Sequence, residues 1–259
     1  MLMTKKYFFF DIDGTLTDIR TGTIVPSALQ TLQQLQANGH FVAIATGRAH
    51  YKARRFMEEV SLHNMVCSGG GALVIDDRLI QNTPLPLQPA KALLRQAEAR
   101  GYGVLLMLDD SIRVYSKDDR FRRQVGERKE PTEYIVDPSL NYDDLTAIYK
   151  IYVAVSREQE EQLTTKEALG HLRFVEDYLM FQYDAKDQGI RAMMKHLQAP
   201  LTDVVVFGDD HNDLIMFDPC WTSIAMGNAC DALKQKATYV TRANVEDGIQ
   251  HACRHFGWI

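Results

Sequence analysis

Short apolar runs, each too brief for a helix, constrain the fold of this chain more than any other feature. Near the amino end they are Tyr7–Phe10, Phe41–Ala45 and residues 65–68. Strands buried on both faces of a parallel sheet have this apolar character. Stretches with helical spacing of apolar residues lie between them, at residues 26–38 and 51–60. Alternating strands and helices predict an α/β fold with a doubly wound parallel sheet and a Rossmann-like core.

The same alternation returns near the carboxyl end, where residues 188–197 and Asp231–Lys236 have helical spacing. Between and after them, residues 204–207, 223–226 and 239–241 read as strands. The middle differs: Pro84, Pro86 and Pro89 mark a connection, followed by a helix near 90–100, short strands, and a helix near 158–169. We therefore predict a core made of residues 1–83 and 184–259, with an inserted α+β domain over residues 84–183.

Composition excludes several classes of function. The chain has 259 residues, of which 46% are hydrophobic, which is enough for a sizeable core. A net charge of −5 argues against nucleic-acid or anionic-membrane partners. The four cysteines show no C-x-x-C spacing, and neither a signal peptide nor a membrane-spanning run is evident. We expect a cytoplasmic protein without a membrane partner.

The motif DIDGTL at residues 11–16 follows the first strand directly. Ligands bind at the carboxyl ends of strands in open α/β sheets, so Asp11 and Asp13 stand where chemistry is expected. Two neighbouring carboxylates can divide their work, one acting as an ionised nucleophile and the other carrying a proton. The simpler alternative is a polar turn after a strand, which the complete hexapeptide disfavours.

A second acidic motif, GDDHND at residues 208–213, also follows an apolar run. Asp209, Asp210 and Asp213 repel one another unless a cation or a proton offsets their charge. Oxygen-only ligands at a strand end suit Mg²⁺, which keeps waters and a substrate phosphate in its shell. His211 is better interpreted as a solvated loop histidine, because hard Mg²⁺ prefers oxygen.

Two weaker signals complete the set. Thr46, Gly47 and Arg48 follow the second strand and offer a hydroxyl, a bare backbone and a guanidinium to an anion, although a plain turn is the simpler interpretation. Lys186 precedes the predicted helix at 188–197. If these pieces meet, Mg²⁺ and Lys186 offset the charges of Asp11, Asp209 and Asp213, and phosphoryl transfer becomes the expected chemistry.

These four motifs, in this order, resemble the haloacid dehalogenase superfamily of phosphatases, and most closely its Cof-like branch. The AMGNA motif at 225–229 and EDGI at 246–249 resemble that branch's C-terminal signature. The resemblance implies a Mg²⁺-dependent phosphatase whose inserted domain is a cap. It also implies that Asp11 is the nucleophile and Asp13 the general acid-base, and that Thr46 and Lys186 bind the phosphate. Mg²⁺ would be bound by Asp11, Asp209 and the Asp13 carbonyl. Asn212 and Asp213 would support the metal and the phosphate, with Asp213 behind the direct ligands.

Two positions depart from the branch's pattern. Gly70, within a Ser-Gly-Gly-Gly-Ala run, stands where asparagine is usual, and a tight turn is the simpler interpretation of the run. Asp187 follows Lys186, where glycine is usual. Two alternatives stay open: a sugar phosphomutase, which would need an activating bisphosphate, and a non-hydrolytic phospho-acceptor signalling module, which the long insert disfavours. We expect a small phosphorylated metabolite as substrate, and the sequence names neither it nor the oligomeric state.

Overall fold

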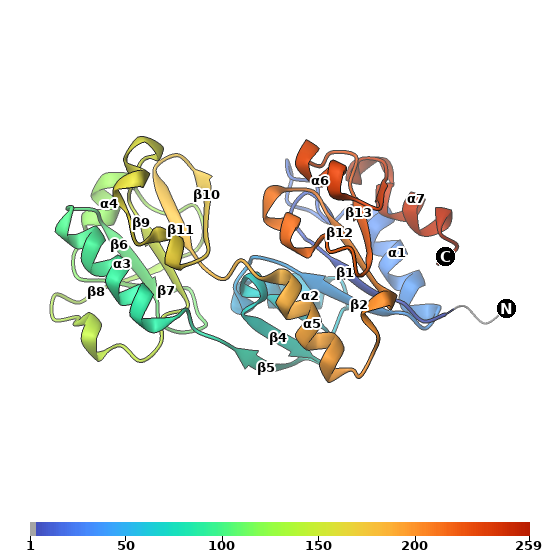
Figure 1. Ribbon diagram of the computed structural model, residues 1–259, viewed down its shortest axis with the longest axis horizontal. Helices are drawn as coiled ribbons and strands as arrows, with labels where there is room; N and C mark the ends of the chain where they lie inside the picture. Colours follow the sequence, from blue (N-terminus) through green and yellow to red (C-terminus); the bar gives the residue numbers. More distant parts are fainter. Residues whose placement is uncertain (1–3) are drawn as a thin grey trace. The chain divides into compact units, whose positions relative to one another are not determined.

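The computed structural model describes residues 4–259, which divide into two compact units (Figure 1). The first unit comprises the described residues up to Asn82 together with Ala185–Ile259, and the second is the insert Thr83–Asp184. Each unit has one sheet and its own hydrophobic core. Because the first unit is assembled from both ends of the chain, side chains far apart in sequence can meet in it.

The first unit contains a mixed sheet of eight strands in the order β14-β13-β12-β1-β2-β3-β4-β5. The strands are β1 (Tyr7–Phe10), β2 (Phe41–Ala45), β3 (Met65–Cys67), β4 (Ala72–Ile75), β5 (Arg78–Asn82), β12 (Val204–Gly208), β13 (Thr222–Ala225) and β14 (Tyr239–Val240). The strands from β14 to β3 pair in parallel, while β4 and β5 add an antiparallel hairpin at one edge. The α/β doubly wound fold is thus confirmed, and the parallel sheet carries an antiparallel edge that was not predicted.

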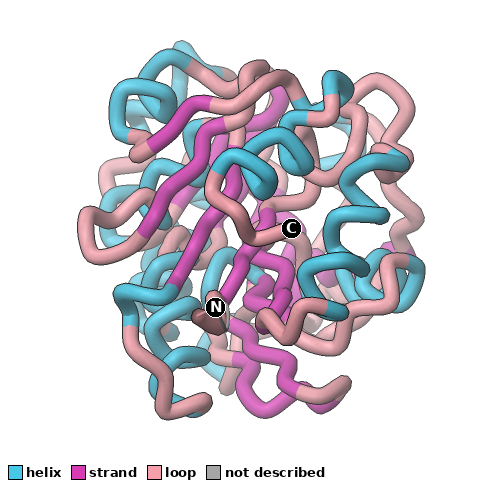
Figure 2. Tube along the Cα trace, turned by 90° about the vertical axis from the view of Figure 1, so that its right-hand side faces the viewer, coloured by secondary structure: helices cyan, strands magenta, loops and turns pink. Residues whose placement is uncertain are grey.

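Helices cover both faces of this sheet, whose strands run side by side in Figure 2. The helices are α1 (Pro26–Ala37), α2 (His50–Glu59), α5 (Lys186–His196), α6 (Asp231–Lys236) and α7 (Gly248–His255), with short 3₁₀ turns η1 (Ser68–Gly70), η5 (Leu201–Asp203), η6 (His211–Met216) and η7 (Asn244–Glu246). Successive residues of a strand point to opposite faces, so Phe8 and Phe10 pack with α1, α2 and α7 while Phe9 packs with α5 and α6. Burial on both faces explains why β1 is wholly apolar.

The register of the central strands places their carboxyl ends together. Phe10 lies opposite Phe207 on one side and Ile44 on the other. The backbone N–H of Asp11 then donates to the Phe207 carbonyl at 3.0 Å. The chain therefore leaves β1, β2 and β12 at the same end of the sheet, the carboxyl ends of its parallel strands. Ligands bind there in folds of this kind.

The second unit is an α+β structure with a sheet of order β10-β11-β9-β6-β7-β8. Its elements are α3 (Leu87–Ala99), β6 (Val104–Met107), β7 (Arg113–Ser116), α4 (Arg120–Val125), β8 (Glu133–Val136), η2 (Tyr142–Asp144), β9 (Lys150–Val153), η3 (Arg157–Gln162), η4 (Lys166–Ala168), β10 (His171–Val175) and β11 (Tyr178–Phe181). Leu94 of α3 packs in the core with Ile151 and Phe181 of the sheet. The insert thus buries a core of its own.

The helix predicted near residues 158–169 was wrong, because the chain forms the two separate turns η3 and η4 there. Buried Lys166 binds Glu161 at 2.6 Å, and Arg173 of β10 binds Glu160 at 2.9 Å. Both glutamates therefore form ion pairs in the segment where the predicted helix is replaced by two turns. The helical spacing of the sequence does not reveal these ion pairs. Strand β8 and helix α7 were also not predicted.

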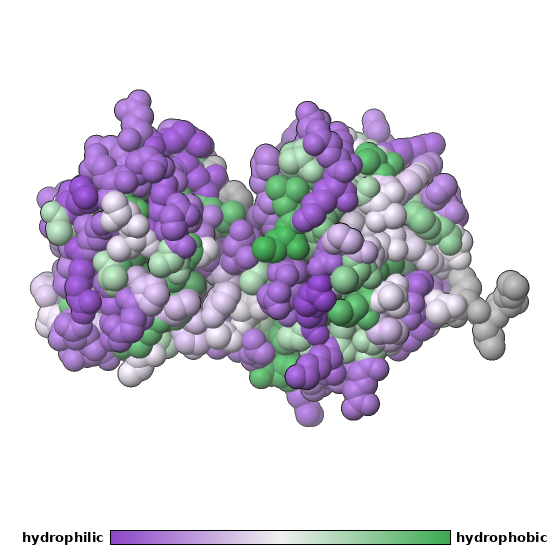
Figure 3. All heavy atoms as spheres, in the orientation of Figure 1, coloured by the Kyte–Doolittle hydropathy of each residue, from purple (hydrophilic) through white to green (hydrophobic). Residues whose placement is uncertain are grey.

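The surface agrees with the composition. Hydrophilic residues predominate on the face that Figure 3 shows, with apolar residues scattered among them. Among the described residues, no helix is both long and apolar enough to cross a membrane.

Candidate active site

Three aspartates and one lysine meet at the carboxyl edge of the core sheet. Asp11 follows β1, Asp209 and Asp213 follow β12, and Lys186 begins α5. Carboxylate oxygens of the three aspartates lie within 4.8 Å of one another, and all four residues are buried. The sequence-predicted residues that come together most closely are therefore these four.

Lys186 is the only cation that the structure records bonded to these carboxylates in the described chain. Its Nζ lies 2.7 Å from Asp11 Oδ1 and 2.6 Å from Asp213 Oδ1. The other oxygen of Asp213 accepts the backbone N–H groups of Asp209 and Asp210, at 2.9 and 3.3 Å. Both oxygens of Asp213 are thus occupied by protein donors, and the side chain braces the site.

The pKa values of this cluster show a charge imbalance. Burial, followed by the Asp213 charge, raises the pKa of Asp11 well above its usual value. The same two causes raise the pKa of Asp209 to about 7. Burial opposes a charged Lys186, but the Asp11 and Asp213 carboxylates raise its pKa overall. One lysine cannot offset three buried carboxylates, so the folded protein favours protonating them or binding a further cation.

A divalent cation fits this donor set. Asp11 and Asp209 offer oxygen atoms at the end of the sheet, and such hard donors suit a hard ion. Thr15, fully buried, donates its hydroxyl to Asp209 Oδ1 at 2.8 Å and so orients that carboxylate. A charge of two would also offset the two carboxylates that Lys186 leaves uncompensated.

Gly14 is needed for this arrangement. Its φ of +86° lies in the left-handed region, and a Cβ there would stand 2.1 Å from Asp209 Oδ2. A side chain at position 14 would therefore displace the Asp209 carboxylate. The glycine of the DIDGTL motif serves both the turn and the close approach of the two loops.

Asp13 stands apart from the buried cluster and pairs with Arg48. Its side chain is 56% exposed, and Arg48 Nε donates to its Oδ2 at 2.9 Å. Arg48 in turn leaves the turn after β2, whose Thr46 hydroxyl accepts the Arg48 backbone N–H at 3.1 Å. The structure thus joins Arg48 to the DIDGTL loop, a pairing that sequence spacing did not indicate.

The run of three glycines positions Lys186. Gly70 has φ +103°, and a Cβ there would lie 2.1 Å from the Ala185 carbonyl oxygen. The Ala185 N–H donates to the Gly69 carbonyl at 2.8 Å. The run forms the tight 3₁₀ turn η1, as expected, and its backbone packs directly against the start of α5. The departure from asparagine at position 70 therefore coincides with close contact between two backbones.

The remaining predicted residues are placed as follows. Thr46 is buried at the end of β2, which neighbours β1, and Gly47 is half-buried in the turn that follows. Asn212 is half-buried on η6, between the two aspartates Asp209 and Asp213. No hydrogen bond joins the Asn212 side chain to another described residue.

Sequence reasoning gave no role to three residues that hold the DIDGTL loop. One is Thr15, described above. Asn228 donates to the Gly14 carbonyl at 2.9 Å, and Asn244 donates to the Thr17 carbonyl at 2.7 Å. The Asn244 N–H also donates to the Asn228 side chain. Asn228 lies in the C-terminal AMGNA motif, so the motif itself was the available signal.

The chain matches known proteins along nearly its whole length. A family model described as haloacid dehalogenase-like hydrolase matches residues 8–253. YkrA of Bacillus subtilis (strain 168), named as a candidate phosphatase, is 31% identical over 98% of this chain and 99% of its own. YitU of the same organism, named 5-amino-6-(5-phospho-D-ribitylamino)uracil phosphatase, is 28% identical over 98% of each chain.

Solved structures share the fold. A Geobacillus kaustophilus protein superposes with a TM-score of 0.82 at 25% identity, over 99% of this chain and 100% of its own. The subclass IIB sugar phosphatase BT4131 gives a TM-score of 0.80 at 24% identity, over 98% and 100%. With the family match over most of its length, this chain belongs to the haloacid dehalogenase-like hydrolases, in their Cof-like branch, and is a phosphatase.

Proposed function

We propose that the protein is a Mg²⁺-dependent phosphatase that hydrolyses a small phosphomonoester through a phospho-aspartate on Asp11. The observation that carries the proposal is the buried pair of Asp11 and Lys186 beside Asp209 at the carboxyl edge of the sheet. Lys186 keeps one Asp11 oxygen engaged, so the other oxygen is the attacking atom. Bound Mg²⁺ would be held by Asp11, Asp209 and the Asp13 carbonyl, and it would supply charge that stabilises the transferring phosphoryl group.

The protein's own residues would divide the reaction into two displacements. Asp11 attacks phosphorus, the bond from phosphorus to the leaving oxygen breaks, and Asp13 gives that oxygen a proton. In the second displacement Asp13 takes a proton from water, the water oxygen attacks phosphorus, and Asp11 leaves as a carboxylate. Thr46, Gly47, Arg48 and Lys186 would hold the phosphate oxygens, while Asn212 and Asp213 would keep the metal and phosphate groups in place.

Small phosphorylated metabolites are the proposed substrate class. YitU is named for a ribitylaminouracil phosphate, and a 24% identical Escherichia coli (strain K12) relative, YbhA, is named a pyridoxal phosphate phosphatase. Both names describe phosphomonoesters of small molecules. We propose that the insert Thr83–Asp184 is the cap that selects among them, because it folds around its own core and interrupts the catalytic unit only once.

The test compares the wild type with Asp11→Asn on a panel of phosphorylated metabolites with Mg²⁺ present. An amide cannot form the acyl phosphate, so Asp11→Asn should stay folded by circular dichroism and lose turnover, and wild-type protein quenched during turnover should carry one phosphoryl group by mass. Chelator should remove activity, Mg²⁺ should restore it, and Ca²⁺ should inhibit because its larger shell misplaces the phosphate. Full turnover by Asp11→Asn, or after exhaustive chelation, would contradict the proposal.

The role of the insert needs a separate experiment. A variant in which a short linker replaces Thr83–Asp184 should hydrolyse p-nitrophenyl phosphate with Mg²⁺ while losing selectivity among the metabolites. If that variant is folded and retains the wild-type selectivity, the insert is not the element that chooses the substrate.

A further inference from the structure

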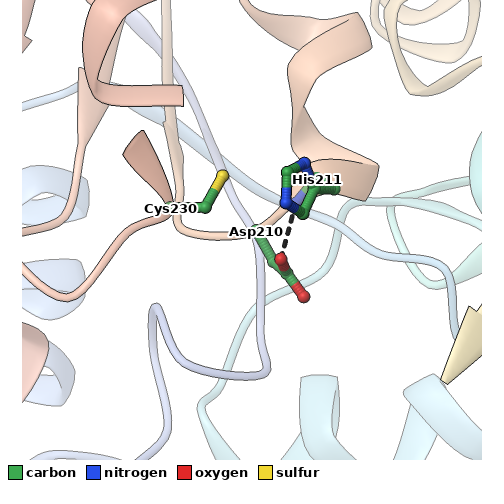
Figure 4. Close-up of side chains that lie close together, drawn as sticks. All are labelled: Asp210, His211 and Cys230. Carbon is green, nitrogen blue, oxygen red and sulfur yellow. Dashed lines mark hydrogen bonds between the residues drawn. The ribbon is translucent and has the colours of Figure 1, made fainter. Parts of the chain in front are cut away.

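A second group of potential metal ligands lies beside the acidic cluster and shares no residue with it. Asp210, His211 and Cys230 bring a carboxylate oxygen, an imidazole nitrogen and a thiol sulfur within 4.8 Å of one another. Figure 4 shows the three side chains close together, and its dashed line marks the hydrogen bond between His211 and Asp210. The mechanism proposed above uses none of these three side chains.

Two separate segments build this group, and the backbone fixes their spacing. Asp210 and His211 begin the turn η6 after β12, while Cys230 directly precedes α6. The Cys230 N–H donates to the Asp209 carbonyl at 2.9 Å. That hydrogen bond holds the start of α6 against the loop that carries Asp209, and it brings Cys230 next to Asp210 and His211.

The side chains are available for binding from solvent. Asp210 and His211 are exposed, and Cys230 is half-buried. Within the described part of the chain, neither the His211 ring nor the Cys230 thiol has a hydrogen bond or an ion pair. Asp210 accepts the His211 N–H at 2.7 Å through one oxygen. Among the described residues, an ion bound by the imidazole and the thiol would therefore displace no recorded contact of those two groups, whereas recruiting Asp210 would compete with its hydrogen bonds.

The donor set selects the chemistry of the ion. Thiolate and imidazole are the ligands of zinc and its neighbours among the transition metals, whereas Mg²⁺ takes oxygen. Zinc is usually four-coordinate, so three protein ligands would leave one coordination position for water. The site differs in kind from the oxygen-only cluster of Asp11 and Asp209 and would not compete with it for Mg²⁺.

We propose that Asp210, His211 and Cys230 form an inhibitory site for a thiophilic divalent ion of the zinc type. The inhibitory part rests on the proposed function. The Asp210 carboxylate caps η6, and the Asp213 side chain accepts in return from the Asp210 N–H. An ion that recruits Asp210 would weaken this reciprocal cap, and Asp213 also binds Lys186. Binding would thereby disturb the charge arrangement around Asp11, with the thiol proton released to the buffer.

Binding is tested without any phosphatase measurement. Chelator-treated full-length protein in excess Mg²⁺ is titrated with Co²⁺, which reports a bound thiolate by near-ultraviolet charge-transfer absorption. Wild type should show this band, and added Zn²⁺ should abolish it. Cys230→Ser and His211→Gln should lose it, while Cys220→Ser and His63→Gln, which change an exposed cysteine and an exposed histidine elsewhere, should keep it. Absence of the band in wild type, or its persistence in Cys230→Ser, overturns the site.

Regulation is tested by Zn²⁺ inhibition of p-nitrophenyl phosphate hydrolysis at saturating Mg²⁺. Cys230→Ser should keep the uninhibited rate. It should need a Zn²⁺ concentration about tenfold or more above that of the wild type for half inhibition, because loss of a ligand lowers the affinity for the ion by at least that factor. Equal inhibition of wild type and Cys230→Ser would mean that Zn²⁺ displaces Mg²⁺ instead, which overturns the regulatory role. If the proposed function itself failed, the Co²⁺ band would be unaffected, so the two failures are distinguishable.

Discussion

The guanidinium of Arg48 holds both carboxylate oxygens of Asp13, with Nε 2.9 Å from Oδ2 and Nη2 in contact with Oδ1. The pair connects the turn after β2 to the loop after β1. A carboxylate engaged on both oxygens cannot also pass a proton to a leaving group. If Asp13 is the general acid, the Arg48 pair therefore separates when substrate phosphate draws the guanidinium away.

Asp13→Asn should damage the hydrolysis of alkyl phosphates more than the first step with p-nitrophenyl phosphate. An alkoxide needs a proton as it leaves, and general acid help is worth on the order of 10²–10⁴-fold, whereas nitrophenolate leaves without much help. The measurement is a rapid-mix burst assay on both substrates, with the mass of the quenched protein. The variant should show a burst of nitrophenol and retain phosphate on Asp11.

Asp203→Asn is a suitable control for that experiment. Asp203 ends the turn η5 directly before β12, at the opposite end of that strand from Asp209, and it forms an ion pair with Lys6 at 2.7 Å. Its rates should match those of the wild type. Equal losses on both substrates in Asp13→Asn, without a burst, would reduce Asp13 to a residue that shapes the loop.

Lys186→Met should destabilise the protein and abolish turnover. Removing one partner of a buried ion pair costs about 3–5 kcal/mol, because the remaining charge is left uncompensated. Urea unfolding in chelator measures the loss, and Lys195→Met, which changes an exposed lysine of the same helix, should lose little. A Lys186→Met protein as stable as Lys195→Met would show that the lysine is not needed to offset Asp11.

The loss should also depend on pH with a definite sign. Burial and Asp213 raise the pKa of Asp11, and Lys186 is the chief influence that lowers it. Without the lysine, the pKa of Asp11 in the folded protein should rise further above that of the unfolded chain. The free energy of unfolding then falls as pH rises from the unfolded-state pKa of Asp11 to its folded-state pKa. The stability that Lys186→Met loses relative to the wild type should therefore be larger near about pH 8 than near about pH 5.

Gly70→Ala should lower activity more than its backbone strain alone explains. A non-glycine residue in the left-handed region costs about 1–2 kcal/mol, and at Gly70 the added Cβ would also lie 2.1 Å from the Ala185 carbonyl. Gly39→Ala is the matched control, since Gly39 has φ +86° with nothing within 4 Å of its Cβ. Both variants should lose stability, and only Gly70→Ala should lose turnover, because it displaces Lys186. Similar turnover in the two variants would refute this positioning.

His40 should make the folded protein sensitive to acid. Burial lowers the pKa of His40, a backbone hydrogen bond with Trp258 opposes that shift, and the charges of Lys6 and Lys5 lower the pKa further, so that it lies below its usual value overall. A lowered folded value means that the unfolded chain takes up a proton first, so this stability is present above the unfolded pKa and is lost as pH falls. His40→Gln should flatten the decline of the unfolding free energy between about pH 7.5 and about pH 5. The exposed His63→Gln should leave that slope unchanged.

Local sequence pattern determined the strands of the core and the order of its motifs. Strands buried on both faces must be apolar, so β1 and β12 are visible as runs, and Asp11 and Asp209 are visible as the first charges after them. The parallel sheet then brings these strand ends to one edge, which is why the acidic cluster could be predicted without coordinates. Lys186 was a weak signal that rested on the other motifs, because a lone lysine before a helix has no local signature.

Tertiary structure alone decided the contacts that depend on long-range packing. Asp13 pairs with Arg48, Asn228 and Asn244 bond to the DIDGTL loop, and Gly70 approaches Ala185. Each of these contacts joins segments that no local spacing relates. The meeting of His211 with Cys230 arises in the same way. Periodicity records which face of an element is buried, whereas side-chain partners are fixed only when the elements pack, and chemistry at this site depends on the partners.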